Sequence, residues 1–303
     1  MLKSKILLAA VILVLGVSAL SVQAADVPAK PALVCDVYPG LASNSLTYAR
    51  LGDLPSGVVL KTDSLTIKDA DILSEIAKVP QEMQAQIKKN AFFLLENMAT
   101  RQLLLSLAKA KTAGQTEASP LDERALIQTY IKGLVANVEA SDAEVSKFYE
   151  ENKDACGGAT LDQMKDQLKQ MVLQQKQQAL IDEHVRTMGQ RVPIEVSASW
   201  TKEQSILAKD NPVDKARSSG KPSLVDFGST GCRPCDMLAP ILETLNVLFV
   251  HVGQEQILAA RYGIQSIPMQ FFYDKDGKEV FRHTGFWPQV EIEKKLAEMG
   301  VTQ

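Results

Sequence analysis

Two cysteines separated by two residues, at a predicted strand-to-helix junction, constrain this chain more than any other feature. The apolar pair Leu224-Val225 predicts a buried strand, residues 228–231 a tight turn, and the residues after Cys235 a helix. Cys232 then lies at the helix N-terminus, where unpaired backbone N–H groups, the helix dipole and the charge of Arg233 favour a thiolate. The pattern indicates a redox-active dithiol in which Cys232 attacks and Cys235 resolves the mixed disulfide.

A zinc site and a structural disulfide are the alternatives for the same two cysteines. Zinc is disfavoured because no second Cys-x-x-Cys motif is present, and the histidines, His184, His251 and His283, are scattered. We therefore predict no metal and no organic cofactor. The strand before the motif and the Ile-Pro pair after it favour redox chemistry over a purely structural bridge.

From about residue 200 onward, the chain resembles the thioredoxin family. The resemblance rests on several features that occur in the family's order. They are the strand Leu224-Val225-Asp226-Phe227, the motif Cys232-Arg233-Pro234-Cys235, Pro240 in the following helix, the segment 261–268 ending in Ile267-Pro268, the strand–turn–strand pattern 271–280 with its Asp-Gly turn, and a last helix at 288–299 after Gly285.

This resemblance implies an α/β thioredoxin-like fold and a client-binding surface. Pro268 would form a cis peptide bond and lie against the disulfide; such bonds are rare enough to indicate a purpose. Ile267 and Pro268, together with Arg233 and Pro234, would bind an extended strand of the client protein.

The resemblance also assigns a role to Asp226. It would be buried beneath the cysteines, where a raised pKa allows it to pass a proton to or from Cys235. An ordinary strand-end carboxylate is the alternative. The family often has a lysine near this acid, and the corresponding position here is Phe249.

Other departures from the family pattern surround the motif. Gly231 replaces a tryptophan and Gly228 an aromatic residue, which predicts a more open surface, and Met269 replaces the threonine that commonly follows the cis-proline. The segment between the second cysteine and this proline is also shorter than usual. Residues 229–246 still provide the dozen or so residues that a right-handed crossover needs, so we predict a short helix there.

The N-terminus has the three parts of a secretory signal peptide. Lys3 and Lys5 precede an apolar run at 6–20, and small residues follow at 21–25, so we place the signal peptide at residues 1–24. An uncleaved membrane anchor is the alternative, although the run is short for a span of about 20 residues. No cysteine stands at the cleavage point, so lipid attachment is not predicted.

Cleavage of this segment would leave an exported, soluble protein, and the bacterial periplasm is the expected compartment. The formal net charge is −3 and the pI about 5.8, and no basic patch with interleaved aromatic residues is present. Nucleic acid is therefore not a predicted partner. No second run is apolar enough for a span, so no membrane association is predicted after cleavage.

Export affects the interpretation of the two remaining cysteines, Cys35 and Cys156, because thiols tend to pair in an oxidising compartment. They are candidates for a structural disulfide that would close a long loop. Two free thiols are the alternative, since spacing along the sequence does not establish proximity in the fold.

The chain is long enough for two domains, and we predict an α+β two-domain organisation. A mainly helical domain is assigned to residues 25–198, a junction to 199–222 and the thioredoxin-like domain to 223–303, with a start near 200 as the alternative. Before the last domain, apolar periodicity and capping boxes predict strands at 58–62, 64–68 and 192–196, and helices at 69–78, 81–111, 121–139, 141–152, 160–188 (ended by Gly189), 203–209 and 212–218.

The helical domain resembles the N-terminal chaperone module of the SurA/PrsA-type foldases. Segments 65–71, 101–104, 141–152 and 192–196 carry this resemblance. That family often has a parvulin prolyl-isomerase domain between the last two helices, whereas here residues 153–159 alone fill the gap. The resemblance implies chaperone-like binding of clients without prolyl isomerisation.

We predict an exported thiol–disulfide oxidoreductase that acts on folding or misfolded proteins. Its partners would be unfolded or cysteine-containing exported proteins, together with a redox partner protein that the sequence does not identify. Pro234 favours reduction of clients, whereas export and Arg233 favour oxidation or isomerisation, so the direction stays open. The alternative is a periplasmic chaperone or holdase that uses its thioredoxin-like domain mainly for binding.

Overall fold

The computed structural model describes residues 31–111, 120–245 and 247–301. The predicted signal peptide, residues 1–24, lies outside the described residues, as does most of the predicted loop 114–120. Among the helices that are described, none is long and apolar enough to cross a membrane.

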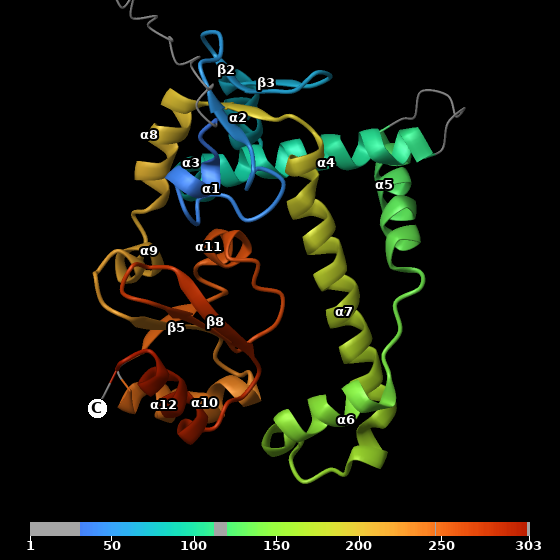
Figure 1. Cartoon of the computed structure of the whole chain (residues 1–303), viewed down its shortest axis with the longest axis vertical. Coiled ribbons are helices and arrows are strands. Elements are labelled where there is room, and N and C mark those ends of the chain that lie inside the picture. The colour runs from blue at the N-terminus through green and yellow to red at the C-terminus, as the bar shows by residue number, and fades with distance from the viewer. Residues whose placement is uncertain (1–30, 112–119, 246, 302–303) are drawn as a thin grey trace, which may run out of the picture. The chain divides into compact units, whose positions relative to one another are not determined.

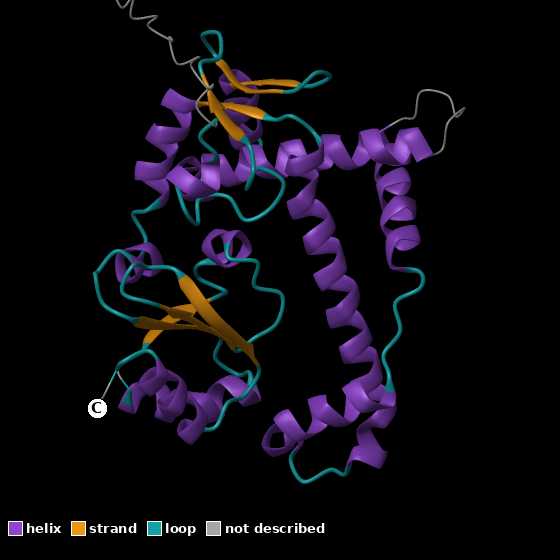
Figure 2. Ribbon diagram, viewed as in Figure 1, coloured by secondary structure: helices purple, strands orange, loops and turns teal. Residues whose placement is uncertain are grey.

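A small mixed sheet joins two parts of the chain that are far apart in sequence (Figures 1 and 2). Its strands lie in the order β1 (Arg50–Gly52), β4 (Glu195–Ser197), β2 (Val58–Lys61) and β3 (Thr66–Lys68). Strand β4 pairs parallel to β1 and antiparallel to β2. The structure confirms the three predicted strands, with β4 slightly later in the chain. Strand β1 was not predicted, because its residues Arg50-Leu51-Gly52 include a glycine and no β-branched or aromatic side chain.

Helices pack against this sheet and extend from it. Helix α4 contributes Phe92, Leu95, Ala99 and Leu103 to the main core at helical spacing, as its apolar pattern predicts. A second, smaller cluster joins α6 to the first half of α7. The elements are α1 (Val34–Val37), α2 (Asp69–Ala77), α3 (Gln81–Lys89), α4 (Ala91–Lys111), α5 (Pro120–Val135), α6 (Asp142–Glu151), the 3-10 helix η1 (Lys153–Cys156), α7 (Leu161–Arg191), α8 (Ala198–Ala208) and α9 (Pro212–Arg217).

Capping boxes fix the starts of α6 and α7, as predicted. The Ser141 hydroxyl accepts from the backbone N–H of Glu144, and the Glu144 carboxylate accepts from the backbone N–H of Ser141. Thr160 and Gln163 make the same pair of bonds at the start of α7. Each box satisfies backbone donors that the first turn of a helix leaves unpaired.

Several helix boundaries differ from the prediction. Helix α8 begins at Ala198 instead of near 203, and α5 ends at Val135 instead of near 139. The single helix predicted at 81–111 is interrupted at Asn90, whose φ of −116° and ψ of 31° are not helical. Gly189 does not end α7, which continues to Arg191. Gly189 instead packs so closely against the carbonyl oxygen of Ser45 that a Cβ atom would clash with it. Close packing, rather than helix termination, therefore explains the glycine.

The candidate disulfide between Cys35 and Cys156 does not form. Both thiols are free, which was the alternative that the sequence left open. Cys35 belongs to α1, beside the main core, whereas Cys156 packs against the α6–α7 cluster. Helix α7 leads from that cluster to the main core, and its 31 residues correspond to roughly 45 Å. A disulfide requires Cα atoms within about 7 Å, so the two cysteines lie too far apart to pair.

The C-terminal region is a four-stranded sheet with helices on both faces, as predicted (Figures 1 and 2). Its order is β6-β5-β7-β8, with β5 and β6 parallel and the other pairs antiparallel. The elements are β5 (Ser223–Gly228), α10 (Arg233–Thr244), β6 (Leu248–His251), α11 (Gln256–Arg261), β7 (Met269–Tyr273), β8 (Glu279–Thr284) and α12 (Gln289–Glu298).

Alternation along β5 and β7 determines which side chains meet which helices. Val225 and Phe271 pack in the cluster that includes residues of α9 and α11, whereas Leu224 and Phe272 pack with α10 and α12. Successive residues of a strand point to opposite faces, so Asp226 lies on the same face as Leu224. Asp226 therefore faces the layer that contains α10.

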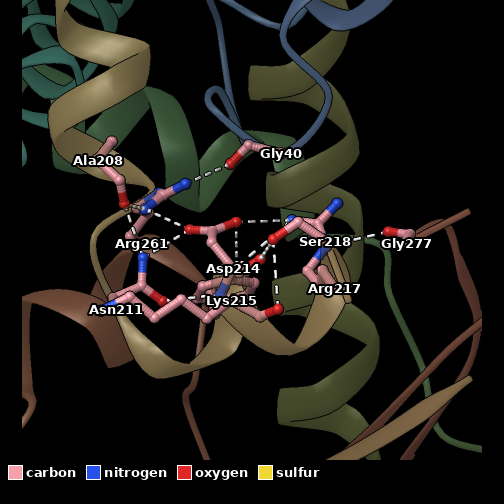
Figure 3. A network of polar contacts seen from close by, with 10 residues as sticks. Gly40, Ala208, Asn211, Asp214, Lys215, Arg217, Ser218, Arg261 and Gly277 are labelled. Atoms are coloured by element: carbon pink, nitrogen blue, oxygen red, sulfur yellow. Dashed lines mark hydrogen bonds and ion pairs between the residues drawn. The ribbon is translucent and has the colours of Figure 1, made fainter. Parts of the chain in front are cut away.

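A buried ionic network holds α11 in place (Figure 3). The Asp214 carboxylate pairs with Arg261 at 3.0 Å and with Arg217 at 3.3 Å. Arg261 also donates to the carbonyl oxygens of Ala208 and Gly40, at 2.8 and 3.0 Å. The network thus ties the last residue of α11 to the end of α8, to α9 and to the loop that contains Gly40.

The close approach at Gly189 predicts that Gly189→Ala is destabilising. The added methyl group meets a backbone oxygen that cannot move without displacing its loop, so we expect a loss of about 1–3 kcal/mol in the free energy of unfolding. Gly133→Ala in α5 is the matched control, because its Cβ would meet only the flexible end of Lys111. There we expect a gain of up to about 1 kcal/mol from helix propensity. Urea denaturation measures both; equal effects would contradict the packing argument.

Candidate active site

The two cysteines of the motif form a disulfide at the start of α10. Cys232 is the N-cap residue, Cys235 lies within the first turn, and their Cα atoms are 5.2 Å apart. Cys235 is buried and Cys232 half-buried, so the first sulfur is the more accessible one. Arg233 is exposed and Pro234 half-buried beside it. The N-terminal position predicted for Cys232 is confirmed, and it favours a thiolate after reduction.

The segment that ends in Pro268 lies beside this disulfide. The Ile267–Pro268 peptide bond is cis, as predicted, and the Sγ atom of Cys232 is 3.8 Å from the carbonyl oxygen of Ile267. The carbonyl oxygen of Pro268 accepts a 2.8 Å hydrogen bond from the backbone N–H of Gly285. The segment before β7 is therefore held against the accessible sulfur.

A hollow of about 360 Å³ adjoins Ile267. Its lining comes from the residue after β6, from α11 and from the segment before Pro268, and consists of Val252, Gln256, Ala259, Ala260, Ile264, Gln265, Ser266 and Ile267. Its lining suits an apolar side chain of an extended peptide better than a charged group. Sequence analysis identified Ile267 here and missed the contribution of α11.

Asp226 is buried on β5, and its neighbour across the sheet is Gln270 on β7. The Gln270 Nε2 atom donates a 2.7 Å hydrogen bond to Asp226 Oδ1. Burial raises the pKa of Asp226 to about 6, and the hydrogen bond from Gln270 opposes this rise. Sequence analysis missed Gln270, although a single polar residue in the apolar run 269–273 was a signal of a buried polar partner.

Phe249 on β6 is the neighbour of Asp226 on the side of the strand away from Gln270. The parallel register of β5 and β6 pairs Asp226 with Phe249, whose side chain is 47% exposed. A Cβ atom at Gly228 would lie 2.7 Å from the Phe249 ring and 3.2 Å from Asp226 Oδ2. The ring therefore covers Gly228 next to the carboxyl group, and a hydrophobic group stands where a cation would lower the pKa.

The described residues contain no group of three or more His, Cys, Asp or Glu side chains that could hold a metal ion. Around the disulfide, the side chains described above provide two sulfur atoms, the buried carboxyl group of Asp226 and an apolar hollow next to Ile267.

Known proteins are similar to this region. Residues 210–300 match the family model described as "Thioredoxin-like domain". Thioredoxin from Staphylococcus epidermidis is 36% identical over 99 residues, 30% of this chain and 93% of that protein. The SPbeta prophage-derived thioredoxin-like protein YosR from Bacillus subtilis is 36% identical over 78 residues, 25% of this chain and 96% of that protein. The structure of a mutant thioredoxin from Halobacterium salinarum NRC-1 is 27% identical, covers 30% of this chain and 85% of that one, and has a TM-score of 0.28.

The raised pKa of Asp226 predicts a pH-dependent effect of Asp226→Asn on stability. An acid with a higher pKa in the folded than in the unfolded state binds more protons when folded, so stability is lost as the pH rises from 3.8 through about 6. Removing the acid should stabilise the oxidised protein at pH 8 by about 3 kcal/mol, and this gain should shrink toward pH 4. Urea denaturation across this range measures it; a gain that is independent of pH would contradict the burial of an ionisable group.

Proposed function

Because the chain belongs to the thioredoxin family through its C-terminal domain, we propose that it is an exported thiol–disulfide oxidoreductase acting on folding or misfolded proteins. One observation carries the proposal: a disulfide at a helix N-terminus lies against a cis-proline segment, on the sheet face that also bears a buried acid. The first sulfur is accessible to a client and the second is shielded. That asymmetry suits an attacking and a resolving cysteine.

Reduction of a client proceeds in two exchanges. The Cys232 thiolate attacks one sulfur of a client disulfide; a Cys232–client bond forms, the client bond breaks, and the other client sulfur leaves as a thiolate. The Cys235 thiol then gives its proton to ionised Asp226, and the new thiolate attacks Cys232. The Cys232–Cys235 bond forms and the remaining client sulfur leaves. Two electrons pass from the dithiol to the client, and the enzyme ends in the disulfide form. The reverse sequence oxidises a client dithiol.

The balance between the two directions depends on the stability of the dithiol relative to the disulfide. The charge of Arg233 and the start of α10 stabilise a Cys232 thiolate, and so favour the reduced enzyme and the oxidation of clients. Equilibration with glutathione buffers gives the reduction potential. A value near that of known strong reductants would assign the enzyme to client reduction, and a higher value to oxidation or isomerisation.

The proposed clients are unfolded or cysteine-containing exported proteins, recognised in part by the helical region. Its resemblance to the SurA/PrsA-type chaperone module motivates this assignment. Methionine and phenylalanine side chains could provide an adaptable binding surface, but Phe92, Met98 and Met164 pack in the cores, whereas Met171 is exposed. Exposed apolar side chains available to a client lie on α2, α7 and α8: Leu73, Met171, Leu180, Ile206 and Leu207.

These exposed side chains also favour a second candidate function, that of a chaperone or holdase whose thioredoxin-like domain mainly binds clients. A variant lacking both cysteines of the motif separates the two functions. Under the holdase hypothesis it would suppress aggregation of a denatured model protein as well as the parent does. Under the oxidoreductase hypothesis it would lose all disulfide exchange.

The order of attack predicts that Cys235→Ser traps a client. With no resolving thiol, the Cys232–client disulfide should persist and appear on non-reducing gels as an adduct that dithiothreitol releases. A denatured protein with an accessible disulfide serves as the client. Cys232→Ser should form no adduct, and Cys35→Ser, which removes a free thiol of α1 outside the motif, should behave like the parent. Equal trapping by both motif variants would contradict the proposed roles.

A further inference from the structure

Gln270 carries the only amide side chain on strand β7. The other members of β7, Met269, Phe271, Phe272 and Tyr273, are apolar or aromatic, and all five residues are buried. The amide of Gln270 has no measurable exposure. Its Nε2 donates to Asp226, but its Oε1 is buried without a hydrogen-bond partner.

An amide oxygen buried without a partner destabilises a fold by about 1–3 kcal/mol, and an apolar side chain of similar shape avoids that loss. Packing alone therefore does not account for glutamine at this position. A local conflict of this kind is typical of a residue with a functional role.

The sheet register places Gln270 next to Asp226. Residues on four neighbouring strands form one row across the sheet: Phe249, Asp226, Gln270 and His283. Because Asp226 and Gln270 are direct cross-strand partners, both lie on the face that packs against the α10 layer. Helix α10 carries the buried Cys235, so Gln270 supports the acid on the side of the resolving thiol.

The amide group suits both protonation states of that acid. When Asp226 is ionised, the Gln270 N–H donates to Oδ1, as in the structure. When Asp226 is protonated, its O–H needs an acceptor, and a half-turn of the amide brings Oε1, the buried atom without a partner, to face it. A lysine in contact with the acid would stabilise only the ionised state.

We propose that Gln270 is a positioning residue that holds the Asp226 carboxyl group in both protonation states during proton exchange with Cys235. This inference rests on the proposed oxidoreductase function and deepens it. The step it assists is transfer of one proton from the Cys235 thiol to the Asp226 carboxylate, which leaves a thiolate and a carboxylic acid; the reverse step returns the proton. Gln270 keeps the Asp226 carboxyl group in the same orientation during the forward and the reverse transfer.

Gln270→Met removes the donor and the acceptor and keeps a similar shape. We expect the reduced variant to resolve a Cys232–client disulfide roughly tenfold more slowly, since a positioned acid or base contributes a hundredfold or more. The midpoint of its pH–rate profile should move to higher pH, because loss of the hydrogen bond disfavours the ionised acid. Stopped-flow single-turnover kinetics between pH 5 and 9 measure both quantities.

Two control variants isolate this effect. Phe272→Leu removes packing from the same face of β7 without touching Asp226, so its pH–rate profile should match the parent's. The neighbouring elements carry further titratable groups. They include Cys235 and Asp236 on α10, His251 on β6, Glu279, Arg282 and His283 on β8, and Glu291, Glu293, Lys294 and Lys295 on α12; Asp236 is exposed. His283→Gln tests whether the shift originates at that imidazole, and it should leave the midpoint unchanged.

Titration of the Asp226 carboxyl carbon by NMR separates this inference from the proposed function. A higher pKa in Gln270→Met than in the parent, with both proteins folded, supports the hold on Asp226 even if no client is turned over. An unchanged pKa of Asp226 and an unchanged pH–rate profile would contradict the inference and leave Gln270 with a structural role only. Absence of any disulfide exchange by the parent protein would instead overturn the proposed function and leave the NMR result standing.

Discussion

The antiparallel pairing of β5 with β7 is the interaction on which the candidate site depends. It runs from the Ser223–Tyr273 pair to the Phe227–Met269 pair, so β7 begins directly after the cis-proline and opposite the strand that leads into the disulfide. A shift of one residue would turn Asp226 to the α11 face and away from Cys235. The same shift would move Leu224 and Phe272 out of the layer that contains α10 and α12, in which they pack.

The pKa of Asp226 is raised because the carboxyl group is buried and no neighbouring cation offsets the burial. Phe249 on one side and Gln270 on the other exclude water from Asp226 without supplying charge. The result is a carboxyl group with a pKa of about 6, which is closer to neutral pH than the pKa of an exposed aspartate. A group that titrates near the working pH exchanges protons most effectively in both directions, which suits a reaction that runs as reduction or oxidation.

Local patterns in the sequence were sufficient for the dithiol, the capped helices and the α/β region. Cys232 and Cys235 lie where the strand–turn–helix pattern places them, and the Ser141 and Thr160 capping boxes form as their spacing indicates. Properties that depend on register or on distant packing were not predictable in this way. Gln270 becomes significant only through its pairing with Asp226, and the close contact that requires Gly189 involves a loop more than a hundred positions earlier in the chain.

The two buried aspartates of the C-terminal domain, Asp214 and Asp226, differ in how fully their carboxylates are paired. Around Asp214, each carboxylate oxygen meets an arginine, and Arg261 joins three separate segments, so breaking this charged pair would leave a buried charge at a loss of about 3–5 kcal/mol. That network fixes the end of α11, from which the chain continues to Ile267 and Pro268. The carbonyl oxygen of Ile267 lies next to the accessible sulfur of Cys232. Around Asp226, by contrast, one amide makes one hydrogen bond and no charge opposes the carboxylate. The ionic network holds the end of α11 in place. The Asp226 carboxyl group, on the sheet face that packs against α10, has instead a single side-chain hydrogen bond and a pKa raised to about 6.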